Sequence, residues 1–467
     1  MHMGPQPHTR GRFCAAALAT IFVTASCSAP SSSVHSLLVP APSPALQHRA
    51  RFHHAGASTP ITHVVVIIQE NRSVDNLFNG FPNADTTQYG YDSHGNLHVL
   101  QPVSLATECG GGHSHTSFVS EFNNGAMNGW DLNNIVCYHG QTLPDGMFAY
   151  VPGSETAAYW AAASNYALAD EVFQGNEGPS FPAHQYLIAG QSGGHGADGT
   201  WAFAENGGGS SSSDDSVEQG PPVRHSCSNR KPIIAQIDFQ SSYPGTEGNT
   251  TAPCKDYPTI FDLAMSHSPP LSWRYYANQA GTLWSAVDSI RHLWQRREGP
   301  TIPESTVLND IASHQLPSIA YVTPSWRNSD HPHSSPVPAK AGPEWVARVV
   351  NAIGNDPYYW ANTTILITWD DWGGWFDHAV YGSTMHPLSF PTDPYEYGFR
   401  VPLIVISPYV KAHLVDHTQR TFDSVITYIE STFALGSLGM QDSTTDDLSD
   451  MFDYSQQPLQ FVPMPSK

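Results

Sequence analysis

The chain has 467 residues, of which 40% are hydrophobic, so it can bury one large core or two ordinary ones. It carries 20 Lys and Arg residues against 41 Asp and Glu residues, which gives a formal net charge of −21. Because nucleic-acid binding depends on basic side chains that neutralise phosphates, this charge argues against a nucleic-acid partner. A phosphate-containing ligand would have to be bound locally, by a metal ion and histidines.

The first 27 residues have the layout of an export signal. Basic residues precede an apolar run from Phe13 to Val23 that is too short to span a membrane, and the sequence TASCSAP follows it. Cys27 is a candidate for lipid attachment, which would anchor the protein to a membrane as a lipoprotein. Thr24 stands where a lipoprotein signal usually has an aliphatic residue, so ordinary cleavage nearby is the alternative. In either case we expect an exported protein, in the periplasm, on the cell envelope or secreted.

Composition divides the rest of the chain. Residues 28–60 are rich in Ser, Pro and Ala and predict a tether with too little apolar content to fold. The folded domain is expected over residues 61–440, with a flexible Gly- and Ser-rich insertion near 205–222. Residues 441–467 are expected to form a C-terminal tail.

Four cysteines lie beyond the signal, namely Cys109, Cys137, Cys227 and Cys254. An even number of cysteines in an exported protein favours disulfides. Their similar spacings suggest that Cys109 pairs with Cys137 and Cys227 with Cys254, although four cysteines permit three pairings. Because CxxC spacing is missing, a structural zinc site is not expected.

Several runs of branched apolar residues predict strands that are buried on both faces, as in a parallel sheet under helices. In chain order they are HVVVIIQ from His63, LPSIAYVTPS over Leu316–Ser325, NTTILITWDDWGG over Asn362–Gly374 and RVPLIVISPYV over Arg400–Val410, with the shorter SWRYYA over Ser272–Ala277 expected at an edge. Between them, PEWVARVVNAI over Pro343–Ile353 has apolar residues at helical spacing. The alternation predicts an α/β layered fold with a central, largely parallel sheet between helices.

Three of the predicted strands are followed by polar clusters. These are Glu70 with Asn71, Asp330 with His331 and His333, and Asp370 with Asp371. Ligands of α/β proteins bind at the carboxyl ends of the strands, so the three clusters are expected to meet at one sheet edge. Carboxylates brought together repel unless a cation or proton lies between them. Oxygen donors suit Ca²⁺, Mg²⁺ or Mn²⁺, whereas Zn²⁺ or iron would be expected if histidines join.

Two serines in glycine-rich settings are candidate nucleophiles. Ser192 lies in GQSGG, which matches the G-x-S-x-G pattern, but a predicted helix precedes it where a nucleophile elbow requires a strand. Ser180 lies in GPSFPAHQYLIAG, directly before that predicted helix. A hydroxyl at a helix N-terminus is well placed for a developing anion, although a plain capping serine is the simpler alternative.

Five motifs resemble those of the bacterial phosphoesterase family, which contains non-specific phospholipases C and related acid phosphatases. They are ENRSVDNLF over Glu70–Phe78, GPSFPAHQYLIAG over Gly178–Gly190, SDHPH over Ser329–His333, TWDDWGGWFDH over Thr368–His378 and GFRVPLIVISPYVK over Gly398–Lys411. The segment from His113 to Trp130 resembles the histidine-bearing segment of the same family. These motifs occur in family order between about residues 61 and 435.

The resemblance implies an alkaline-phosphatase-like fold and hydrolysis through a covalent phosphoenzyme. By position it implies metal binding by Glu70, Asn71, Asp370 and Asp371 together with Ser180, which would be the nucleophile. It also implies that His113, Asp330, His331 and His333 surround the phosphate and handle protons, with His115 as the weaker alternative to His113 and His331 as the acid for the leaving group. Asp377 and His378 are expected to hold the metal ligands in position without binding the metal themselves.

The substrate is expected to be a phosphate ester. The sequence supports phospholipase C and acid phosphatase activity almost equally. The chain stops soon after the last motif, so we expect a single-domain enzyme without the C-terminal domains that are common in the family. Two other functions are kept as alternatives. One is an exported binding protein of the same fold without turnover, and the other is a metal-independent serine esterase that uses Ser192.

Overall fold

The computed structural model describes residues 59–195, 201–206, 226–230, 234–239, 246–296, 301–332, 338–381, 397–443 and 445–466. The export signal with Cys27, the tether up to residue 58, residues 207–222 of the predicted insertion and His333 lie outside these ranges.

An eight-stranded sheet forms the centre of the domain, in the order β15-β14-β16-β1-β17-β18-β8-β19. The strands are β15 Thr301–Pro303, β14 Trp273–Ala277, β16 Ile319–Val322, β1 His63–Gln69, β17 Thr363–Trp369, β18 Leu403–Ile406, β8 Ala167–Ala169 and β19 Leu414–Asp416. From β15 to β17 all neighbours are parallel, β18 is antiparallel to both β17 and β8, and β19 is parallel to β8. The predicted α/β class and largely parallel sheet are therefore confirmed.

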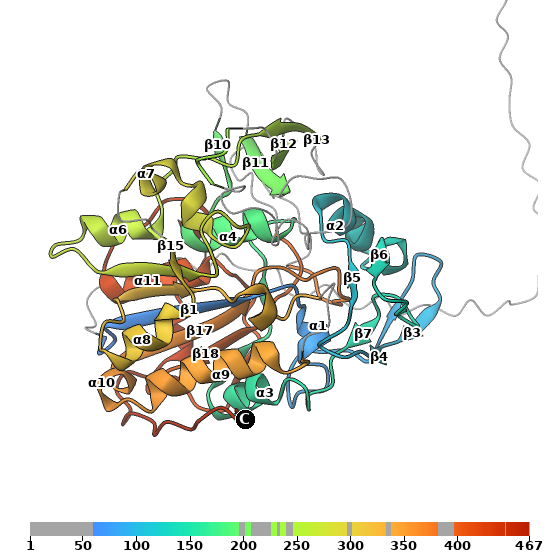
Figure 1. Cartoon of the computed structure of the whole chain (residues 1–467). Coiled ribbons are helices and arrows are strands. Elements are labelled where there is room, and N and C mark those ends of the chain that lie inside the picture. Colours follow the sequence, from blue (N-terminus) through green and yellow to red (C-terminus); the bar gives the residue numbers. More distant parts are fainter. Residues whose placement is uncertain are drawn as a thin grey trace, which may run out of the picture. The chain divides into compact units, whose positions relative to one another are not determined.

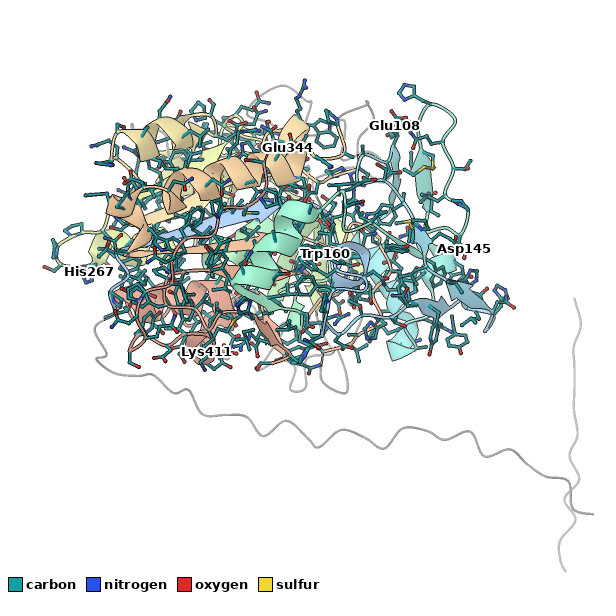
Figure 2. The ribbon with its side chains drawn as sticks, turned by 90° about the horizontal axis from the view of Figure 1, so that it is seen from below. Glu108, Asp145, Trp160, His267, Glu344 and Lys411 are labelled. Atoms are coloured by element: carbon teal, nitrogen blue, oxygen red, sulfur yellow. A yellow bond between two sulfur atoms is a disulfide. The ribbon has the colours of Figure 1, made fainter. Side chains whose placement is uncertain are left out.

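Helices cover both faces of this sheet (Figure 1). One layer holds α4 Ser180–Ala189, α6 Ile260–Ser266 and α11 Ser424–Phe433, and the other holds α3 Ala157–Asn165, α8 Thr306–Ala312, α9 Ala341–Gly354 and α10 Pro357–Trp360. Figure 2 shows α9, which carries Glu344, beside α3, which carries Trp160. Double coverage explains why β1 and β17 are apolar without alternation. In the described ranges, every helix is too short or too polar to cross a bilayer.

Smaller elements surround the carboxyl end of the main sheet and the outer layers. The short strands are β2 Tyr89–Tyr91, β3 Leu97–Val99, β4 Gln101–Pro102, β5 Cys109–Gly111, β6 Ile135–Cys137, β7 Ala149–Tyr150, β9 Val172–Phe173 and β20 Arg420–Thr421. A four-stranded sheet contains β10 Gly193–His195, β11 Trp201–Asn206, β12 Ile234–Phe239 and β13 Thr246–Thr251. The remaining helices are α1 Val74–Leu77, α2 His115–Phe122 and α7 Arg291–Trp294.

Both suggested disulfides are present. Cys109 and Cys137 lie opposite each other in the β5–β6 pair, with an S–S distance of 2.04 Å. Cys227 and Cys254 form the second bond, with an S–S distance of 2.00 Å. The pairing suggested by the spacings is therefore confirmed.

One strand differs from its predicted position. SWRYYA forms β14, which lies between β15 and β16 and is not an edge strand. The edge is taken by β15, whose three residues are too few to be recognised by periodicity.

The segment after residue 440 packs on the core. Leu448, Met451 and Met464 are buried in it, and Phe452 forms a β-bridge to Val410. The expected tail is therefore in contact with the domain over its described residues.

Candidate active site

The three polar clusters meet because the strands that precede them are parallel neighbours. β1 lies between β16 and β17, and it pairs with both in parallel. Glu70 and Asn71 follow β1 directly, and Asp370 and Asp371 follow β17. The cluster at Asp330 follows β16 after a short 3₁₀ helix over Trp326–Asn328. All of these residues except the undescribed His333 therefore start from the same edge of the sheet.

Asn71 links the carboxylates to a histidine. Its backbone N–H donates to Asp370 Oδ1 at 2.9 Å, and its Nδ2 contacts both His113 Nε2 and Asp371 Oδ1 at 3.1 Å. The backbone adopts a φ of 58°, a left-handed conformation that asparagine tolerates better than most residues. With both amide hydrogens engaged, Asn71 Oδ1 is buried and has no hydrogen-bond partner among the described residues. This oxygen is therefore available to a cation.

Ser180 is the first residue of α4, whereas the sequence predicts a position directly before the helix. The hydroxyl does lie at the N-terminus of this helix. The N-cap is Pro179, so Ser180 is not the capping residue that the simpler alternative requires. Its side chain is buried, and Oγ lies 3.2 Å from Asp371 Oδ2 and 3.5 Å from Glu70 Oε2. The hydroxyl is therefore next to the carboxylates and at the positive end of a ten-residue helix.

His184 joins the same group one helical turn after Ser180. Its Nε2 lies 3.0 Å from Glu70 Oε1 and 3.7 Å from Asp370 Oδ2, and its Nδ1 lies 3.3 Å from the Tyr275 hydroxyl. Burial lowers the pKa of His184 to about 4, against the opposing effect of the Asp370 charge. The imidazole is therefore neutral at neutral pH.

The group fits a divalent metal ion. Glu70, Asp370 and Asp371 are each fully buried, and Asp370 Oδ2, like Asn71 Oδ1, has no hydrogen-bond partner in the described part of the chain. Buried carboxylates this close require a compensating positive charge. Glu70, His184 and Asp370 each place a potential ligand atom within 4.8 Å of the others. Carboxylate and amide oxygens are the ligands that divalent ions commonly use.

Two histidines lie beside these carboxylates. His113 Nδ1 bonds to the Gly111 carbonyl at 3.1 Å, so this nitrogen carries the hydrogen and Nε2 accepts from Asn71. The His331 ring centroid is 6.1 Å from that of His113, and His331 Nδ1 donates to the Pro332 carbonyl at 2.7 Å. His115, the weaker alternative to His113, contacts Glu177.

The Asp330 side chain belongs to a separate polar group. Its Oδ2 accepts from the Tyr159 hydroxyl at 2.8 Å and from Trp369 Nε1 at 3.0 Å. Its backbone carbonyl accepts from Arg72 Nε at 2.9 Å. Burial raises the pKa of Asp330 to about 6, while Tyr159, Arg72 and Trp369 oppose the increase. This carboxylate connects the loop that carries His331 to Tyr159 and Trp369, and its Oδ1 is buried without a hydrogen-bond partner among the described residues. The predicted role of Asp330 at the phosphate stays a prediction.

The loop after β17 packs tightly against the loop after β1. Gly373 has a φ of +64°, and a Cβ at this position would lie 2.5 Å from the Asn71 carbonyl oxygen. Only glycine fits this conformation and this approach. The Gly373 N–H donates to Asp371 Oδ1 at 2.7 Å, so the glycine also orients the Asp371 carboxylate.

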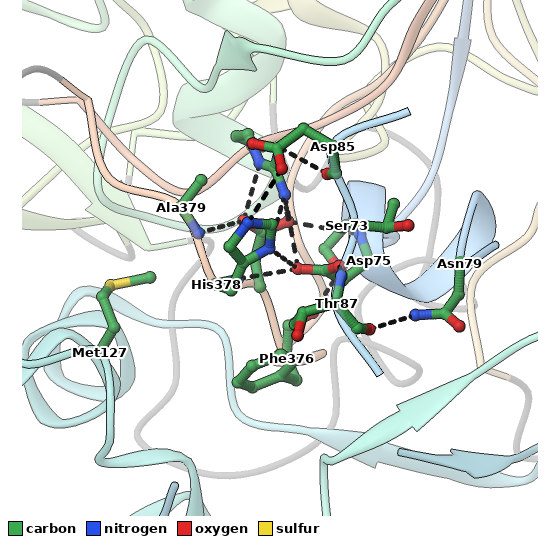
Figure 3. Close-up of polar contacts among 12 residues, drawn as sticks. Ser73, Asp75, Asn79, Asp85, Thr87, Met127, Phe376, His378 and Ala379 are labelled. Carbon is green, nitrogen blue, oxygen red and sulfur yellow. Dashed lines mark hydrogen bonds and ion pairs between the residues drawn. The ribbon is translucent and has the colours of Figure 1, made fainter. Parts of the chain in front are cut away.

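Asp377 and His378 lie in a second group of charges, around Arg400. Figure 3 shows His378 of this group beside Asp75. Arg400 Nε is 2.9 Å from Asp377 Oδ1, and its other nitrogens contact Asp75 at 3.4 Å and Glu171 at 2.9 Å. His378 Nδ1 lies 2.6 Å from Asp75 Oδ2. We call these five residues the arginine cluster. Because Asp75 belongs to α1, the cluster ties the loop after β17 to the helix that follows Glu70 and Asn71.

Two buried residues of the site were missed by the motif analysis. His184 has a sequence signal, because a position four residues after Ser180 lies on the same face of a helix. Glu121 on α2 accepts from Trp372 Nε1 at 2.8 Å, and burial raises the pKa of Glu121 well above its usual range. Its partner follows Asp371 directly but is 251 residues away in sequence, so no local pattern reveals the contact.

Ser192 does not occupy a nucleophile elbow. It follows helix α4 and precedes strand β10, the reverse of the strand–turn–helix order that the elbow requires.

Comparisons with known proteins agree with these motifs. The non-hemolytic phospholipase C of Burkholderia pseudomallei is 24% identical over 81% of this chain and 56% of that protein. The hemolytic phospholipase C of Pseudomonas aeruginosa is 23% identical over 85% of this chain and 57% of that protein. The chain thus spans little more than half the length of either relative. A solved structure of an alkaline phosphatase superfamily protein from Vibrio parahaemolyticus aligns with 85% of this chain and 71% of its own, at 9% identity and a TM-score of 0.37.

The model of the phosphoesterase family matches residues 61–436, which include every motif and every described site residue. The chain therefore belongs to the phosphoesterase family.

Proposed function

We propose that the protein hydrolyses phosphoric esters with Ser180 as nucleophile, through a phosphoserine intermediate and with a divalent metal ion among the carboxylates. The observation that carries this proposal is the position of Ser180 Oγ, at the start of α4 and 3.2 Å from Asp371 Oδ2. A serine placed only for packing would not need a buried carboxylate beside its hydroxyl.

Glu70, Asn71, Ser180, Asp370 and Asp371 would hold the ion. When bound, the ion would lower the pKa of the seryl hydroxyl and screen its repulsion from an anionic phosphate. Asn71 is oriented for this role, because His113 and Asp371 take both of its amide hydrogens and leave Oδ1 without a partner. His113 is in this proposal a residue that orients Asn71 and borders the phosphate.

The remaining steps are assigned to the helix and to His331. Attack of Ser180 Oγ on phosphorus forms the phosphoserine and breaks the bond to the leaving oxygen. The backbone N–H groups at the start of α4 would stabilise the charge on the phosphoryl oxygens. His331 has its Nδ1 hydrogen directed to Pro332, so in the protonated ring Nε2 would give its proton to the leaving oxygen. The neutral Nε2 would then take a proton from the water that attacks the phosphoserine, which restores the protonated ring. Asp330 is assigned to the support of this loop.

The substrate proposed is a phosphodiester of the phosphatidylcholine type, because both relatives described above are named phospholipase C. Monoester hydrolysis of the acid phosphatase kind is the second outcome that the assay must distinguish.

Export is part of the proposal. The two disulfides support it, because disulfides persist in oxidising compartments and are rare in the cytosol. Lipid attachment at Cys27 is the finer proposal, and mass spectrometry of the mature N-terminus tests it.

The test is a matrix of metals, substrates and variants. The purified protein is treated with EDTA, resupplied with one divalent metal at a time, and assayed on p-nitrophenylphosphorylcholine and p-nitrophenyl phosphate. We expect metal-restored turnover that Ser180→Ala lowers by about 10³-fold or more and Ser192→Ala leaves intact. Acid quenching should trap phosphate on the peptide that contains Ser180.

Three results would contradict the proposal in different ways. Turnover that survives both EDTA and Ser180→Ala would show that the reaction needs neither the metal ion nor Ser180 as nucleophile. Loss of turnover in Ser192→Ala alone would support the alternative of a serine esterase that uses Ser192. Metal binding without turnover of either substrate would favour a binding protein.

A further inference from the structure

His184 is a buried polar group of the site that the proposed reaction does not use. It lies on α4, four residues after Ser180, and its side chain has no exposed surface. Its two ring nitrogens face different partners, Tyr275 on one side and the carboxylates of Glu70 and Asp370 on the other.

The partner of Tyr275 constrains which nitrogen of His184 carries the hydrogen. The Tyr275 hydroxyl donates its single hydrogen to the Trp284 carbonyl at 2.7 Å. It can therefore only accept from His184 Nδ1, 3.3 Å away, so this contact is a hydrogen bond only in the tautomer that carries its hydrogen on Nδ1. In that tautomer Nε2 presents a lone pair, whereas in the other one Nε2 would donate to Glu70 Oε1 at 3.0 Å and Nδ1 would face a lone pair of the Tyr275 oxygen.

The Nε2 lone pair faces two carboxylate oxygens. Nε2 is 3.0 Å from Glu70 Oε1 and 3.7 Å from Asp370 Oδ2, and the latter has no hydrogen-bond partner among the described residues. Three buried electron-rich atoms directed at one another repel unless a cation lies among them. Their mutual distances, all within 4.8 Å, are suitable for binding the same ion.

We infer that His184 Nε2 is a nitrogen ligand of the metal ion, in addition to the oxygen ligands of the proposed function, on which this inference rests. One helix then supplies both the nucleophile, Ser180, and a metal ligand. The hydrogen bond from Nδ1 to Tyr275 is the outer contact that a metal-binding histidine commonly makes, and it holds the ring in the required tautomer.

A nitrogen ligand narrows the choice of metal. Ca²⁺ and Mg²⁺ prefer oxygen ligands, whereas imidazole suits Zn²⁺, Co²⁺ and iron and is accepted by Mn²⁺. The site is therefore expected to bind Zn²⁺ or Co²⁺ more tightly than Ca²⁺.

The test measures metal binding and not only activity. Wild type, His184→Leu, Tyr275→Phe and His113→Gln are stripped of metal and titrated with Zn²⁺, Co²⁺ and Ca²⁺ in chelator competition. Removal of a group that orients a ligand typically lowers metal affinity 10–100-fold, so we expect about that loss of Zn²⁺ affinity in Tyr275→Phe and a larger loss in His184→Leu. Ca²⁺ affinity should change little in either variant. His113→Gln is the matched comparison, because it removes the imidazole that orients Asn71, an oxygen ligand. Its Zn²⁺ and Ca²⁺ affinities should fall together, whereas His184→Leu should lower Zn²⁺ affinity selectively.

Spectroscopy of the wild type tests the same ligand without a variant, so the inference can still be decided if a variant does not fold. Pulsed EPR of the Mn²⁺-loaded protein should show coupling to a histidine nitrogen, and His113→Gln should retain it. Absence of nitrogen coupling in the wild type, or unchanged Zn²⁺ affinity in a folded His184→Leu protein, would overturn the inference.

The two proposals fail in distinguishable ways. Nitrogen coupling without ester turnover would leave His184 as a ligand and remove the proposed function. Metal-dependent turnover lost in Ser180→Ala, but without nitrogen coupling, would keep the function and remove His184 from the ligands.

Discussion

Two groups of buried carboxylates lie in this domain, and they differ in the source of the positive charge that compensates them. In the arginine cluster, Arg400 and His378 supply the charge from within the chain. In the candidate site, the carboxylates of Glu70 and Asp370 face His184, which is neutral. The comparison shows that burial of acidic residues does not by itself indicate a metal site, and that a group of buried carboxylates without a cation from the chain is a candidate for one.

The pKa shifts follow the same division. Burial alone would lower the pKa of Arg400, but the charges of Asp377, Asp75 and Glu171 raise it above its usual value. Burial also opposes protonation of His378, but hydrogen bonds to Asp75 and Asp85 raise its pKa to about 10. His184 gains too little from Asp370 to offset burial. The arginine cluster is therefore neutralised internally, and the proposed metal ion would supply the missing positive charge in the site.

Removal of the internal cation should have the largest effect on stability. Arg400→Gln leaves the carboxylates of the arginine cluster without their main counter-charge, so we expect the free energy of unfolding to fall by about 3–5 kcal/mol. Urea unfolding measures this loss, which chelators should not change. The control is Arg274→Gln, because the Arg274–Asp310 pair is partly exposed and its loss should cost about 1 kcal/mol or less. Equal losses of unfolding free energy in the two variants would show that Arg400 is not the main counter-charge of the arginine cluster.

Removal of a carboxylate from the site should act on metal binding. Asp371→Asn keeps an oxygen acceptor for the Gly373 N–H but removes a charge, so metal affinity and turnover should both fall by more than about 100-fold. Isothermal titration and the esterase assay measure the two quantities. Asp377→Asn, in the arginine cluster, should reduce stability and leave metal affinity within a few-fold. A large loss of metal affinity in Asp377→Asn would show that the two clusters are not independent.

Without metal, removal of a site charge should stabilise the protein. Asp370→Asn places an amide where Oδ2 now has no partner, so the EDTA-treated variant should be about 1 kcal/mol more stable than EDTA-treated wild type. With metal present the order should reverse, because only wild type gains binding free energy. Thermal unfolding with and without metal measures both differences. A variant that is less stable under both conditions would argue that the site is compensated without an ion.

The smallest effect is expected from pH and His378. The pKa of His378 is raised to about 10 in the folded protein. Protonated His378 therefore stabilises the fold fully below the ordinary histidine pKa of about 6.5, and this stabilisation is lost as the pH rises through about 10. The side chain is 30% exposed, so the total effect should be about 1 kcal/mol or less. Unfolding of wild type and His378→Gln across this range measures the difference, which should shrink with rising pH. A difference that grows with pH would contradict the assignment of His378 as a cation.

Much of the fold could be predicted because burial on two faces leaves a local signature. β1, β16 and β17 are apolar without alternation, and each is followed by polar residues. Parallel pairing of these three strands then brings their ends together. β14 was misplaced at an edge, because the strand that covers it, β15, has only three residues.

The site could be predicted in part. Glu70, Asn71, Asp370 and Asp371 do converge around Ser180 through the hydrogen bonds of Asn71 and Ser180. Their roles as ligands and nucleophile remain predictions that the experiments above address.

The sequence by itself determined which segments are buried strands, which polar residues follow them and which serine begins a helix, because these properties depend on neighbours within a few residues. The contacts of Asp330 with Tyr159 and Trp369, of Arg400 with Asp377 and of His184 with Glu70 form only in the folded chain. These contacts join residues between 23 and 171 positions apart. Packing of the whole chain brings these residues together, and the hydrophobic periodicity of the sequence does not predict such long-range contacts.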